Sequence, residues 1–538
     1  MKKTLLNLFG FCLISMLIIN CANRGNPSGG PRDTTPPEIT KSEPKNYSTN
    51  FNNNEIKIYF DEYIKIKDVQ RQLIISPPMD PKPVITPLGG ASKRITIKIL
   101  DTLSPNTTYA FNFGNSIVDN NEENPYPYFR YVFSTGSTLD SLTVKGTIID
   151  AELRKPDNFV SVMLYEVDST FNDSVVYNKL PRYITNTLDS TTVFSVENMK
   201  PGKYMMVAIN DKNQDNKFQP QSDKIAFSDT FIDVPTDSTA FFTLKLFNEE
   251  LTPKIIRPRL LSGEKIGFGF QGNYNDMSIN ILSEVPDDYE YRITKDQKTD
   301  TLNYWYKPRL ENTDSLIFNV SNKKGYSEDF TIRISEQKRD TLALKAEPTG
   351  TIKFYETFKI YASTPLSKID EEKIKILDKD SLNVAFSATL DSLENSYAIH
   401  FEKSEENKYA IQILPEAFTD FFNDTNDSLY FNLNTKSYSD YGNARVTLQN
   451  AVYPVIVQFV DEKGEVKYEK FSEKSEPLDF RNMESGDYFL RVIYDSNKNK
   501  KFDTGNYLEK RQPERISYAK EIVEIRAFWD QVVDFTLE

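Results

Sequence analysis

The stretch Glu55-Ile56-Lys57-Ile58-Tyr59-Phe60 shows the pattern that decides the fold. Polar and apolar residues alternate in it, so that on an extended backbone every second side chain lies on the same face. The same alternation occurs in Arg94-Ile95-Thr96-Ile97-Lys98-Ile99 and in Thr331-Ile332-Arg333-Ile334. This pattern is typical of antiparallel strands that bury one face and expose the other.

Turn sequences separate these stretches, for example Ser104-Pro105-Asn106 and Lys200-Pro201-Gly202. They recur about every ten residues, the spacing of short strands in sandwiches and barrels. The chain has 30 Tyr and 36 Phe among 538 residues, and aromatic residues favour half-buried pleated surfaces. No long amphipathic helix is evident. We therefore predict an all-β protein of tandem β-sandwich domains of about 100 residues each.

An internal repeat supports several related domains. Asn198-Met199-Lys200-Pro201-Gly202-Lys203-Tyr204 recurs as Asn482-Met483-Glu484-Ser485-Gly486-Asp487-Tyr488, at an offset of 284 residues. At the same offset, residues 211–218 recur as residues 495–502, without a gap. A chance match over this length is implausible, so we interpret the repeat as a domain duplication.

After the Tyr that both copies share, oxygen-bearing side chains stand at positions 1, 3 and 5 of a calcium loop, and a backbone carbonyl stands at position 7. The candidate ligands are Asp211, Asn213, Asp215 and the Lys217 carbonyl in the first copy, and Asp495, Asn497, Asn499, the Lys501 carbonyl and Asp503 in the second.

The glycine expected at position 6 is replaced by Asn216 and Lys500, and Ser222 and Asn506 stand where a bidentate Glu is expected at position 12. The alternative is an Asx-turn hairpin without an ion, because Asp and Asn stabilise such turns themselves. We leave calcium binding and the ion-free turn open as alternatives; a calcium site here is expected to be weak and structural, with a Kd of about 10⁻⁴–10⁻³ M. No other cofactor is expected.

The N-terminus has the features of a targeting segment. Lys2 and Lys3 precede an apolar run from Leu5 to Ile19 that ends at Cys21. The run is of signal-peptide length and too short for an ordinary membrane-spanning helix. The second cysteine, Cys12, lies inside this run. The expected mature chain therefore forms no disulfide and no thiolate zinc site.

Charge and residue usage exclude several functions. With 65 Lys and Arg against 78 Asp and Glu, the net charge is −13, which does not suit nucleic-acid binding. The one histidine, His400, lies in an alternating strand-like stretch, so multi-histidine metal sites and a Ser-His-Asp triad are not expected. The acidic pair Asp61-Glu62 points to opposite faces of a strand unless a bulge intervenes. We predict that the protein is not an enzyme.

Several motifs in residues 33–136 resemble a bacterial Ig-like domain of the kind found in S-layer and Bacteroidetes envelope proteins. They are Pro36-Pro37, Ile58-Tyr59-Phe60-Asp61-Glu62, Ile75-Ser76-Pro77-Pro78, Leu103-Ser104-Pro105-Asn106-Thr107-Thr108-Tyr109 and Phe133-Ser134-Thr135-Gly136. Residues 345–437 resemble a second copy. The resemblance implies the fold and says little about activity.

Both copies of the internal repeat resemble the transthyretin-like, carboxypeptidase-regulatory-like sandwich. An entry strand such as Val144-Lys145-Gly146-Thr147-Ile148 and the turn Asn-Met-x-x-Gly-x-Tyr carry this resemblance. The stretch Leu17-Ile18-Ile19-Asn20-Cys21 resembles a bacterial lipobox, which implies lipidation of Cys21. The Cys21 stretch and the C-terminal stretch Arg526-Ala527-Phe528-Trp529-Asp530 together resemble those of outer-membrane lipoproteins of Bacteroidetes.

These features predict the following organisation. The signal peptide comprises residues 1–20, the lipidated tether 21–35, the Ig-like domain 36–138, the transthyretin-like sandwich 139–249, a β-rich middle domain 250–344, the second Ig-like domain 345–437 and the second transthyretin-like domain 438–538.

The resemblance implies a non-catalytic lipoprotein at the outer membrane, in either leaflet. We expect an interaction or scaffold subunit that binds outer-membrane β-barrel proteins and associated lipoproteins of an assembly, secretion or uptake machine. The alternative is a glycan-binding surface lipoprotein of a polysaccharide-uptake system. Trp305 and Trp529 are the only tryptophans, which disfavours that alternative because sugar-binding modules present several exposed aromatic residues.

Overall fold

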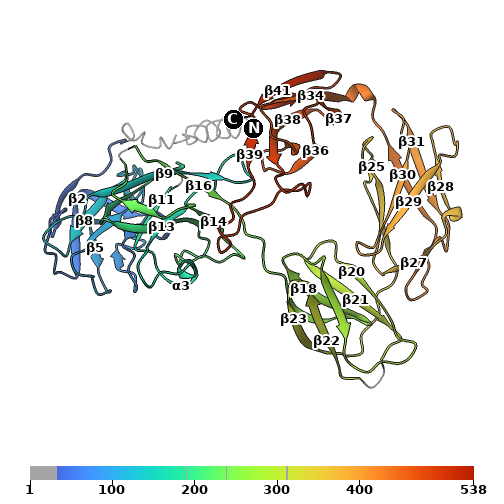
Figure 1. Ribbon diagram of the computed structural model, residues 1–538, viewed down its shortest axis with the longest axis horizontal. Helices are drawn as coiled ribbons and strands as arrows, with labels where there is room; N and C mark the ends of the chain where they lie inside the picture. The colour runs from blue at the N-terminus through green and yellow to red at the C-terminus, as the bar shows by residue number, and fades with distance from the viewer. Residues whose placement is uncertain (1–32, 189–190, 238, 311–312, 538) are drawn as a thin grey trace, which may run out of the picture. The chain divides into compact units, whose positions relative to one another are not determined.

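The computed structural model describes residues 33–188, 191–237, 239–310 and 313–537. Their regular secondary structure is almost only β-strand, arranged in successive packed sheets (Figure 1). The predicted all-β fold of tandem sandwiches is therefore confirmed. We name the parts sandwich I to sandwich V by the strands they contain; the domain boundaries given above stay a prediction. No helix in the described residues is long and apolar enough to cross a membrane.

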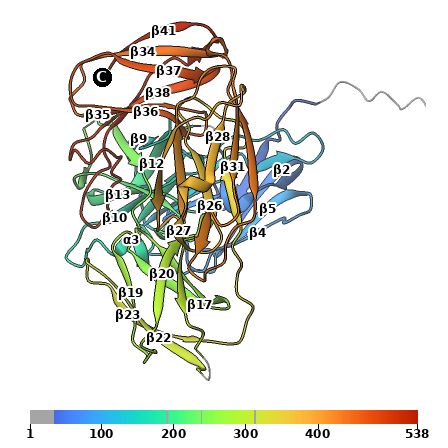
Figure 2. The same cartoon turned by 90° about the vertical axis from the view of Figure 1, so that its right-hand side faces the viewer.

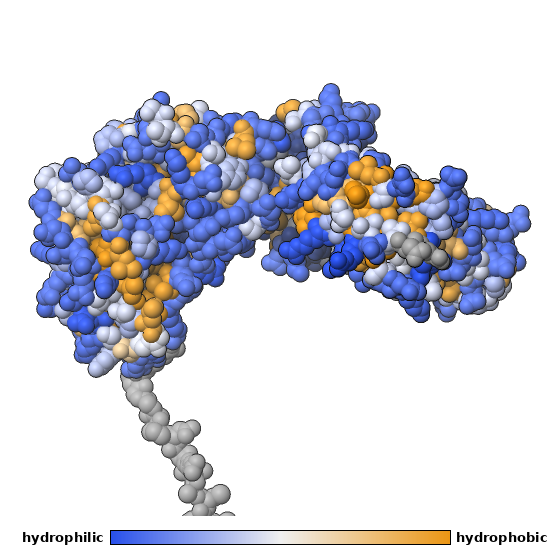
Figure 3. All heavy atoms as spheres, turned by 90° about the horizontal axis from the view of Figure 1, so that it is seen from below, coloured by the Kyte–Doolittle hydropathy of each residue, from blue (hydrophilic) through white to orange (hydrophobic). Residues whose placement is uncertain are grey.

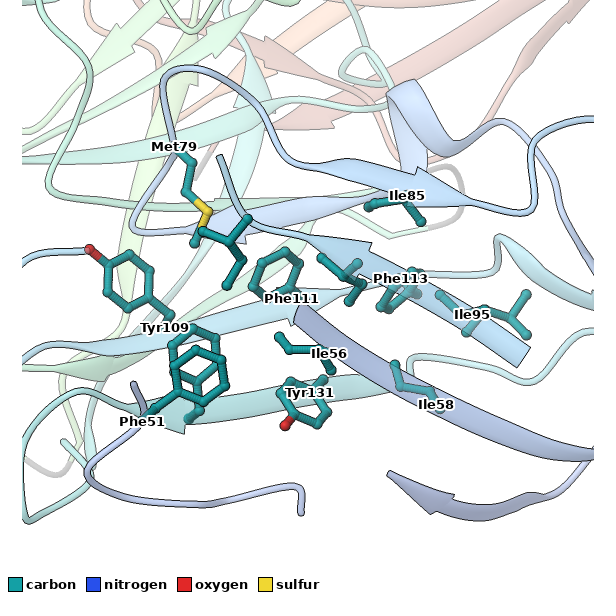
Figure 4. Packing of buried hydrophobic residues seen from close by; sticks show 14 of the residues in the cluster. Phe51, Ile56, Ile58, Met79, Ile85, Ile95, Tyr109, Phe111, Phe113 and Tyr131 are labelled. Carbon is teal, nitrogen blue, oxygen red and sulfur yellow. The ribbon is translucent and has the colours of Figure 1, made fainter. Parts of the chain in front are cut away.

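Sandwich I contains β1 (Ile39–Glu43), β2 (Glu55–Ile66), α2 (Val69–Gln72), β3 (Ile74–Ser76), β4 (Val84–Thr86), β5 (Ser92–Lys98), β6 (Thr108–Asn112), β7 (Ile117–Asp119) and β8 (Arg130–Ser134). One sheet has the order β1-β2-β5-β4, with β7 on β2, and the other has the order β3-β6-β8. Ile56 and Ile58 of β2 face Phe111 of β6 and Tyr131 of β8 in the core between the sheets (Figure 4). The alternating pattern of residues 55–60 therefore buries one face, as predicted.

Sandwich II contains β9 (Leu142–Asp150), β10 (Ser161–Glu166), α3 (Val175–Asn178), β11 (Tyr183–Asn186), β12 (Val193–Met199), β13 (Gly202–Asn210), β14 (Lys224–Phe227), β15 (Ile232–Val234) and β16 (Phe242–Leu246). Strand β13 pairs with β10, β14 and β15, and β9 pairs in parallel with β16.

Sandwich III contains β17 (Lys254–Ser262), β18 (Lys265–Gln271), β19 (Met277–Ile281), β20 (Glu290–Lys295), β21 (Thr301–Lys307), β22 (Ser315–Asn322) and β23 (Ser327–Arg333). Its sheets have the orders β17-β18-β21-β20 and β19-β22-β23. The sequence did not indicate the fold of this part. Its core lies between these two sheets and includes Phe268, Tyr304 and Phe318.

Sandwich IV contains β24 (Leu344–Glu347), β25 (Gly350–Thr351), β26 (Phe358–Ala362), β27 (Leu366–Ile369), η1 (Glu371–Lys373), β28 (Ile374–Leu377), β29 (Phe386–Asp391), β30 (Ser396–Phe401), β31 (Lys408–Ile413), β32 (Phe418–Asp420) and β33 (Leu429–Asn434). The sheets are β24-β26-β30-β29, β25-β33-β31-β28 and the pair β27-β32.

Sandwich V contains η2 (Tyr438–Asp440), β34 (Tyr441–Gln449), β35 (Val455–Val460), β36 (Val466–Ser472), β37 (Leu478–Glu484), β38 (Gly486–Tyr494), β39 (Ile516–Tyr518), β40 (Val523–Ile525) and β41 (Asp530–Thr536). Strands β37, β34 and β41 form one sheet, and β36-β35-β38-β39 the other, with β40 on β38 (Figure 2).

The internal repeat is also a structural repeat. Strand β13 pairs with β10, β14 and β15, and β38 pairs in the same way with β35, β39 and β40. Asn198 and Asn482 both have a left-handed backbone, with φ of 58° and 55°. Asn is among the few residues that tolerate this conformation, which explains why Asn recurs at this place.

By its internal contacts the chain divides into two compact units. One contains sandwich I together with residues 182–188 and 197–200, and the other contains the rest of sandwich II and sandwiches III to V. The contacts between sandwiches described below all lie within the second unit.

Candidate interaction surfaces

Cys21 and the tether up to residue 32 lie outside the described residues. Lipidation of Cys21 therefore stays a prediction.

The first Asp-rich loop connects β13 to β14 and is closed by its own carboxylates. Asp211 accepts hydrogen bonds from the backbone N–H of Gln214 and of Asn216, each at 2.7 Å. The fully buried Asp223, which the sequence pattern did not single out, accepts the N–H of Gln219 at 2.9 Å. Burial raises the pKa of Asp211 above its ordinary value. The loop thus has the hydrogen bonds of an Asx turn and a buried carboxylate whose charge a cation would stabilise.

The other candidate ligands of this loop bind protein groups. Asp215 accepts the N–H of Lys217 at 3.0 Å and the Gln219 side-chain amide at 2.9 Å. Asn213 donates to the Gln219 side-chain oxygen at 3.4 Å. These contacts agree with the Asx-turn alternative.

The second loop connects β38 to β39 and repeats the scheme. The buried Asp495 accepts the backbone N–H of Asn499 at 3.0 Å and of Lys500 at 2.9 Å, through different oxygens. Asp503 accepts the side-chain amides of Asn497 and Asn499 at 2.5 and 2.6 Å. The structure therefore brings the predicted residues Asp495, Asn497, Asn499 and Asp503 together.

Glu514 closes the second loop and was missed by the sequence reasoning. Its carboxylate accepts the N–H of Ser496 at 2.7 Å and the N–H of Asp503 at 3.1 Å. Among the described residues no group of three or more His, Cys, Asp or Glu side chains is arranged to hold a metal ion. Calcium binding stays a prediction.

The remaining residues considered for catalysis, His400 and the pair Asp61-Glu62, lie on two different strands. His400 is exposed on β30, where its ring nitrogen lies 3.5 Å from the Thr389 hydroxyl. Strand β2 does contain a register irregularity next to the pair Asp61-Glu62. Asp61, however, accepts the backbone N–H of Glu38 at 2.8 Å, which fixes the preceding segment to β2.

Sandwiches II and V are joined by hydrogen bonds to backbone carbonyls. The Arg491 guanidinium and the Tyr518 hydroxyl both donate to the Glu152 carbonyl, at 2.7 and 2.6 Å. The Gln512 amide donates to the Phe227 carbonyl at 3.1 Å and to the Asp229 carboxylate at 2.7 Å. Side chains of sandwich V thus satisfy backbone groups of sandwich II that would otherwise need water.

Tyr507 is the central residue of this junction. It comes from the β38–β39 loop and is completely buried. Its ring centroid lies 5.5 Å from that of Phe227 and 6.5 Å from that of Tyr177, both in sandwich II. Its backbone N–H donates to the Glu249 carboxylate at 2.5 Å. Burial raises the pKa of the Tyr507 hydroxyl, so the side chain is neutral at all physiological pH values.

Two neighbours of Tyr507 complete the junction. The Lys510 ammonium lies 3.9 Å from the centroid of the Tyr507 ring and 2.6 Å from the Asp173 carboxylate of sandwich II. A Cβ atom at Gly505 would lie 2.5 Å from the Phe247 ring. A glycine is therefore required for this close approach of the loop to sandwich II.

Sandwich III contacts sandwich IV through a buried carboxylate and two arginines. The completely buried Glu264 side chain pairs with Arg309 at 2.5 Å and Arg339 at 2.7 Å. The Arg339 guanidinium lies 4.3 Å from the ring centroid of Phe422 in sandwich IV, and Trp305 contacts the same ring. Burial alone would raise the pKa of Glu264, but the two arginines outweigh it and hold the pKa below its ordinary value. Glu264 therefore holds the Arg339 guanidinium against the Phe422 ring of sandwich IV.

Polar contacts add to the junction of sandwiches III and IV. The Lys295 N–H donates to the Leu393 carbonyl at 2.6 Å. The Tyr274 hydroxyl donates to the Glu394 carboxylate at 3.2 Å.

Sandwich IV in turn contacts sandwich V. The rings of Phe354 and Tyr438 stack with centroids 4.4 Å apart, and Lys353 pairs with Glu484 at 2.7 Å. Contacts therefore run from sandwich III through IV and V to II, and the chain itself connects II to III. These four parts form a closed circuit.

An exposed aromatic pair precedes the last strand. Phe528 is 86% exposed and Trp529 is 56% exposed. The Phe528 N–H donates to the Tyr441 carbonyl at 2.8 Å, and the Trp529 carbonyl accepts the Asn443 N–H at 2.9 Å. Phe528 has a φ of 58°, a conformation that costs free energy in a non-glycine residue and persists only when the surroundings impose it. The backbone is thus fixed while both rings face solvent.

Other exposed apolar residues are more scattered. On the face shown in Figure 3 they form separate patches among predominantly hydrophilic residues. Val532 of β41, 65% exposed, lies close in sequence to the aromatic pair and extends the apolar character of this end of sandwich V. We call Phe528, Trp529 and Val532 the aromatic tip.

Comparison with known proteins identifies one domain. Residues 33–135 match the family model of the bacterial Ig-like domain. No curated protein matches the sequence. Among solved structures, the surface layer protein SbsC, domains 1–6, matches with 10% identity and a TM-score of 0.17, covering 91% of this chain and 67% of that chain.

Two further solved structures are similar. The N-terminal eight Ig domains of Down Syndrome Cell Adhesion Molecule match with 10% identity and a TM-score of 0.15, covering 91% of this chain and 69% of that chain. Dimeric latent PorU from Porphyromonas gingivalis matches with 8% identity and a TM-score of 0.19, covering 55% of this chain and 36% of that chain.

Proposed function

We propose that the protein is a lipid-anchored, non-catalytic scaffold subunit that docks onto a β-barrel protein complex of the bacterial outer membrane. The observation that carries the proposal is the closed circuit of contacts among sandwiches II to V. The match of residues 33–135 to the bacterial Ig-like domain supports it, because tandem Ig-like domains serve as structural and binding modules more often than as enzymes.

A closed circuit favours scaffolding for a physical reason. Sandwiches joined only by linkers lose conformational freedom when they bind a partner together, and this loss weakens association. Here Tyr507, Glu264 and the stacked pair Phe354–Tyr438 already restrict that freedom in the free protein. Binding surfaces on different sandwiches are therefore available in one arrangement.

The aromatic tip is the docking surface that we propose. Trp and Phe side chains contribute large apolar areas and are enriched at the energetically dominant centres of interfaces. Phe528 and Trp529 keep their rings in solvent on a fixed backbone. Little conformational entropy of this segment is therefore lost when a partner binds. Strand β41 follows directly and is the edge strand of its sheet, which also suits the addition of a partner strand.

The anchor part of the proposal rests on the sequence. The apolar run that ends at Cys21, followed by a tether rich in Gly, Pro, Asn and Ser, supports attachment to a membrane by lipid. Its placement in the outer membrane of a Bacteroidetes cell rests on the family resemblance. Associated lipoproteins of the same complex are the other partners that we propose.

A glycan-binding surface lipoprotein is the second candidate. The exposure of Trp529 favours it, because an exposed aromatic ring can stack on a sugar. A single exposed Trp provides one stacking position, whereas extended polysaccharides are usually held by several.

Affinity purification of the tagged, natively expressed protein from membranes in mild detergent tests the proposal. Mass spectrometry should identify one or more outer-membrane β-barrel proteins in stoichiometric amount. The double variant Phe528→Ser, Trp529→Ser should lose most of this partner. Tyr430→Ser, which changes a single aromatic residue that is 64% exposed in sandwich IV, should retain it. Equal recovery with both variants would exclude the aromatic tip as the docking surface, and recovery of no β-barrel protein would contradict the proposed function.

A further inference from the structure

Sandwich III contains an open pocket of about 440 Å³ on the outer face of its four-stranded sheet. Its floor is formed where β18 and β21 run side by side (Figure 1). Gly267 of β18 pairs with Asn303 of β21, and Gly269 pairs with Thr301. Residues paired across antiparallel strands lie on the same face of the sheet, so that these four residues share the floor.

The two glycines are unusual in the interior of a sheet. Glycine weakens a strand and often marks a place where another backbone or a ligand comes close. A Cβ atom at Gly267 would lie 2.5 Å from the Leu261 side chain, and one at Gly269 would lie 2.7 Å from the Ile256 carbonyl oxygen. The glycines therefore leave room for the Leu261 side chain and for the backbone of edge strand β17 beside the floor of the pocket.

Asn303, which lines the pocket, has an unsatisfied buried polar atom. The residue is 4% exposed, and its Oδ1 atom has no hydrogen-bond partner within the described part of the chain. A buried acceptor without a donor is costly to the folded state. A ligand hydroxyl or N–H group is the donor that this position lacks.

The pocket wall on β17 carries two arginines. The register between β17 and β18 shifts between Ile256 and Arg259, and Arg257 has a φ of 48°. Such bulges redirect side chains and are frequent next to functional sites. Neither Arg257 nor Arg259 has an ion pair with any residue that the structure describes. Both are exposed and available to an anion.

The opposite wall carries carboxylates. Asp296 accepts the backbone N–H groups of Lys298 and Thr299 at 3.0 and 2.9 Å, and Asp300 lines the pocket beside it. This wall repels further negative charge and accepts hydrogen bonds. The pocket as a whole therefore matches a compact ligand that has one anionic group at one end and hydroxyl groups at the other.

We propose that this pocket binds an acidic sugar, with its carboxylate or phosphate on Arg257 and Arg259 and its hydroxyl groups on Asn303, Thr301 and Asp300. Charged groups held by arginine in this way form the stronger class of hydrogen bonds. The volume is in the range of small-ligand sites. An acidic peptide added as a strand to β17 is disfavoured, because the bulge interrupts the edge and Pro258 has no N–H to offer. The inference does not depend on the docking function proposed above.

Titration calorimetry on the full-length protein tests this site. The probes are glucuronate, glucose 6-phosphate, glucose and inorganic phosphate. At least one of the two acidic sugars should bind about tenfold or more tightly than glucose and than inorganic phosphate, because only they engage both walls. The comparison of glucuronate with glucose 6-phosphate tells whether the anionic group is a carboxylate or a phosphate.

Amino-acid substitutions test whether the sugar binds in this pocket. Arg257→Gln and Arg259→Gln should each weaken it about tenfold. Arg333→Gln changes an exposed arginine on β23, in the other sheet of sandwich III, and should leave it unchanged. The arginine variants alter exposed side chains, so that their folding is not in question. Absence of binding by both acidic sugars, equal binding of glucose, or binding that Arg259→Gln leaves unchanged would overturn the proposal, as would preferential binding of an acidic peptide.

Discussion

The ring of Tyr507 lies 5.5 Å from the ring of Phe227 and is completely buried, although the two residues belong to different copies of the internal repeat. The loop that carries Tyr507 connects β38 to β39 and is longer than its counterpart between β13 and β14. The duplicated sandwiches have therefore diverged, and one copy uses its extended loop to bind the other.

Replacement of Tyr507 should loosen this junction. Tyr507→Ala removes a large buried ring and should destabilise the contact by about 3–5 kcal/mol. The Tyr507 hydroxyl has no hydrogen-bond partner among the residues described, so that Tyr507→Phe should be neutral or stabilising by about 1 kcal/mol. Hydrogen exchange of residues 495–515 and 224–247 provides a local measurement, which a multidomain chain requires. Faster exchange with Tyr507→Phe than with the wild type would contradict the described packing.

Glu264 should make the junction of sandwiches III and IV sensitive to acid. Its pKa is held below the ordinary value by Arg339 and Arg309, against the opposing effect of burial. The folded state therefore gains stability from the ionised carboxylate above about pH 4.5, and loses it as the pH falls through the lowered pKa.

Glu264→Gln should cost about 2 kcal/mol at pH 7, a value reduced because both arginines are partly exposed, and should remove this part of the acid sensitivity. Glu336→Gln, at a residue whose side chain is 92% exposed and 4.0 Å from Arg309, is the matched control. Unfolding followed by Trp305 fluorescence between pH 7 and pH 3 measures both. Equal acid sensitivity of Glu264→Gln and the wild type would exclude this role.

Calcium should stabilise the loops of the two repeats if they bind it. An ion bound only to the folded state stabilises it by about 1 kcal/mol when its concentration is several times Kd. The effect of millimolar calcium on the melting temperature should disappear in the double variant Asp211→Ala, Asp495→Ala. Because these changes also break hydrogen bonds of the turns, the difference between calcium and chelator is the informative quantity. No difference in the wild type would leave the Asx-turn interpretation.

The sequence predicted the parts of the fold that depend on local pattern. The alternation in residues 55–60 corresponds to the buried Ile56, Ile58 and Phe60, and the repeated Asn-x-x-x-Gly-x-Tyr element to the same turn and strand in two sandwiches. The Ig-like character of residues 33–135 is confirmed. These features are encoded within a few neighbouring residues, which is why they can be read directly.

Contacts between distant residues could not be predicted in this way. Trp305 and Trp529 both follow an aromatic residue, yet Trp305 is 2% exposed and Trp529 is 56% exposed. The difference arises because the sandwich IV loop with Phe422 lies next to Trp305. Likewise, Asp223 and Glu514 complete the Asp-rich loops from positions outside the recognised spacing.

Membrane attachment should depend on Cys21. Cys21→Ala should release the protein from the membrane fraction or leave an unprocessed precursor, because the acyl chains that hold it would be absent. Cys12→Ala, within the same apolar run, should leave processing and fractionation unchanged. Mature-sized Cys21→Ala protein that still sediments with membranes after a high-salt wash would contradict lipid anchoring.

The mass of the natively expressed protein in mild detergent tests the central claim most directly. If the protein is a docked scaffold subunit, it should elute in a particle much heavier than the 62.0 kDa chain, together with an outer-membrane β-barrel protein, and Phe528→Ser, Trp529→Ser should shift it toward the free mass. A wild-type protein that elutes only as a monomer, and that binds a defined polysaccharide tightly, would contradict the scaffold function and favour the glycan-binding alternative.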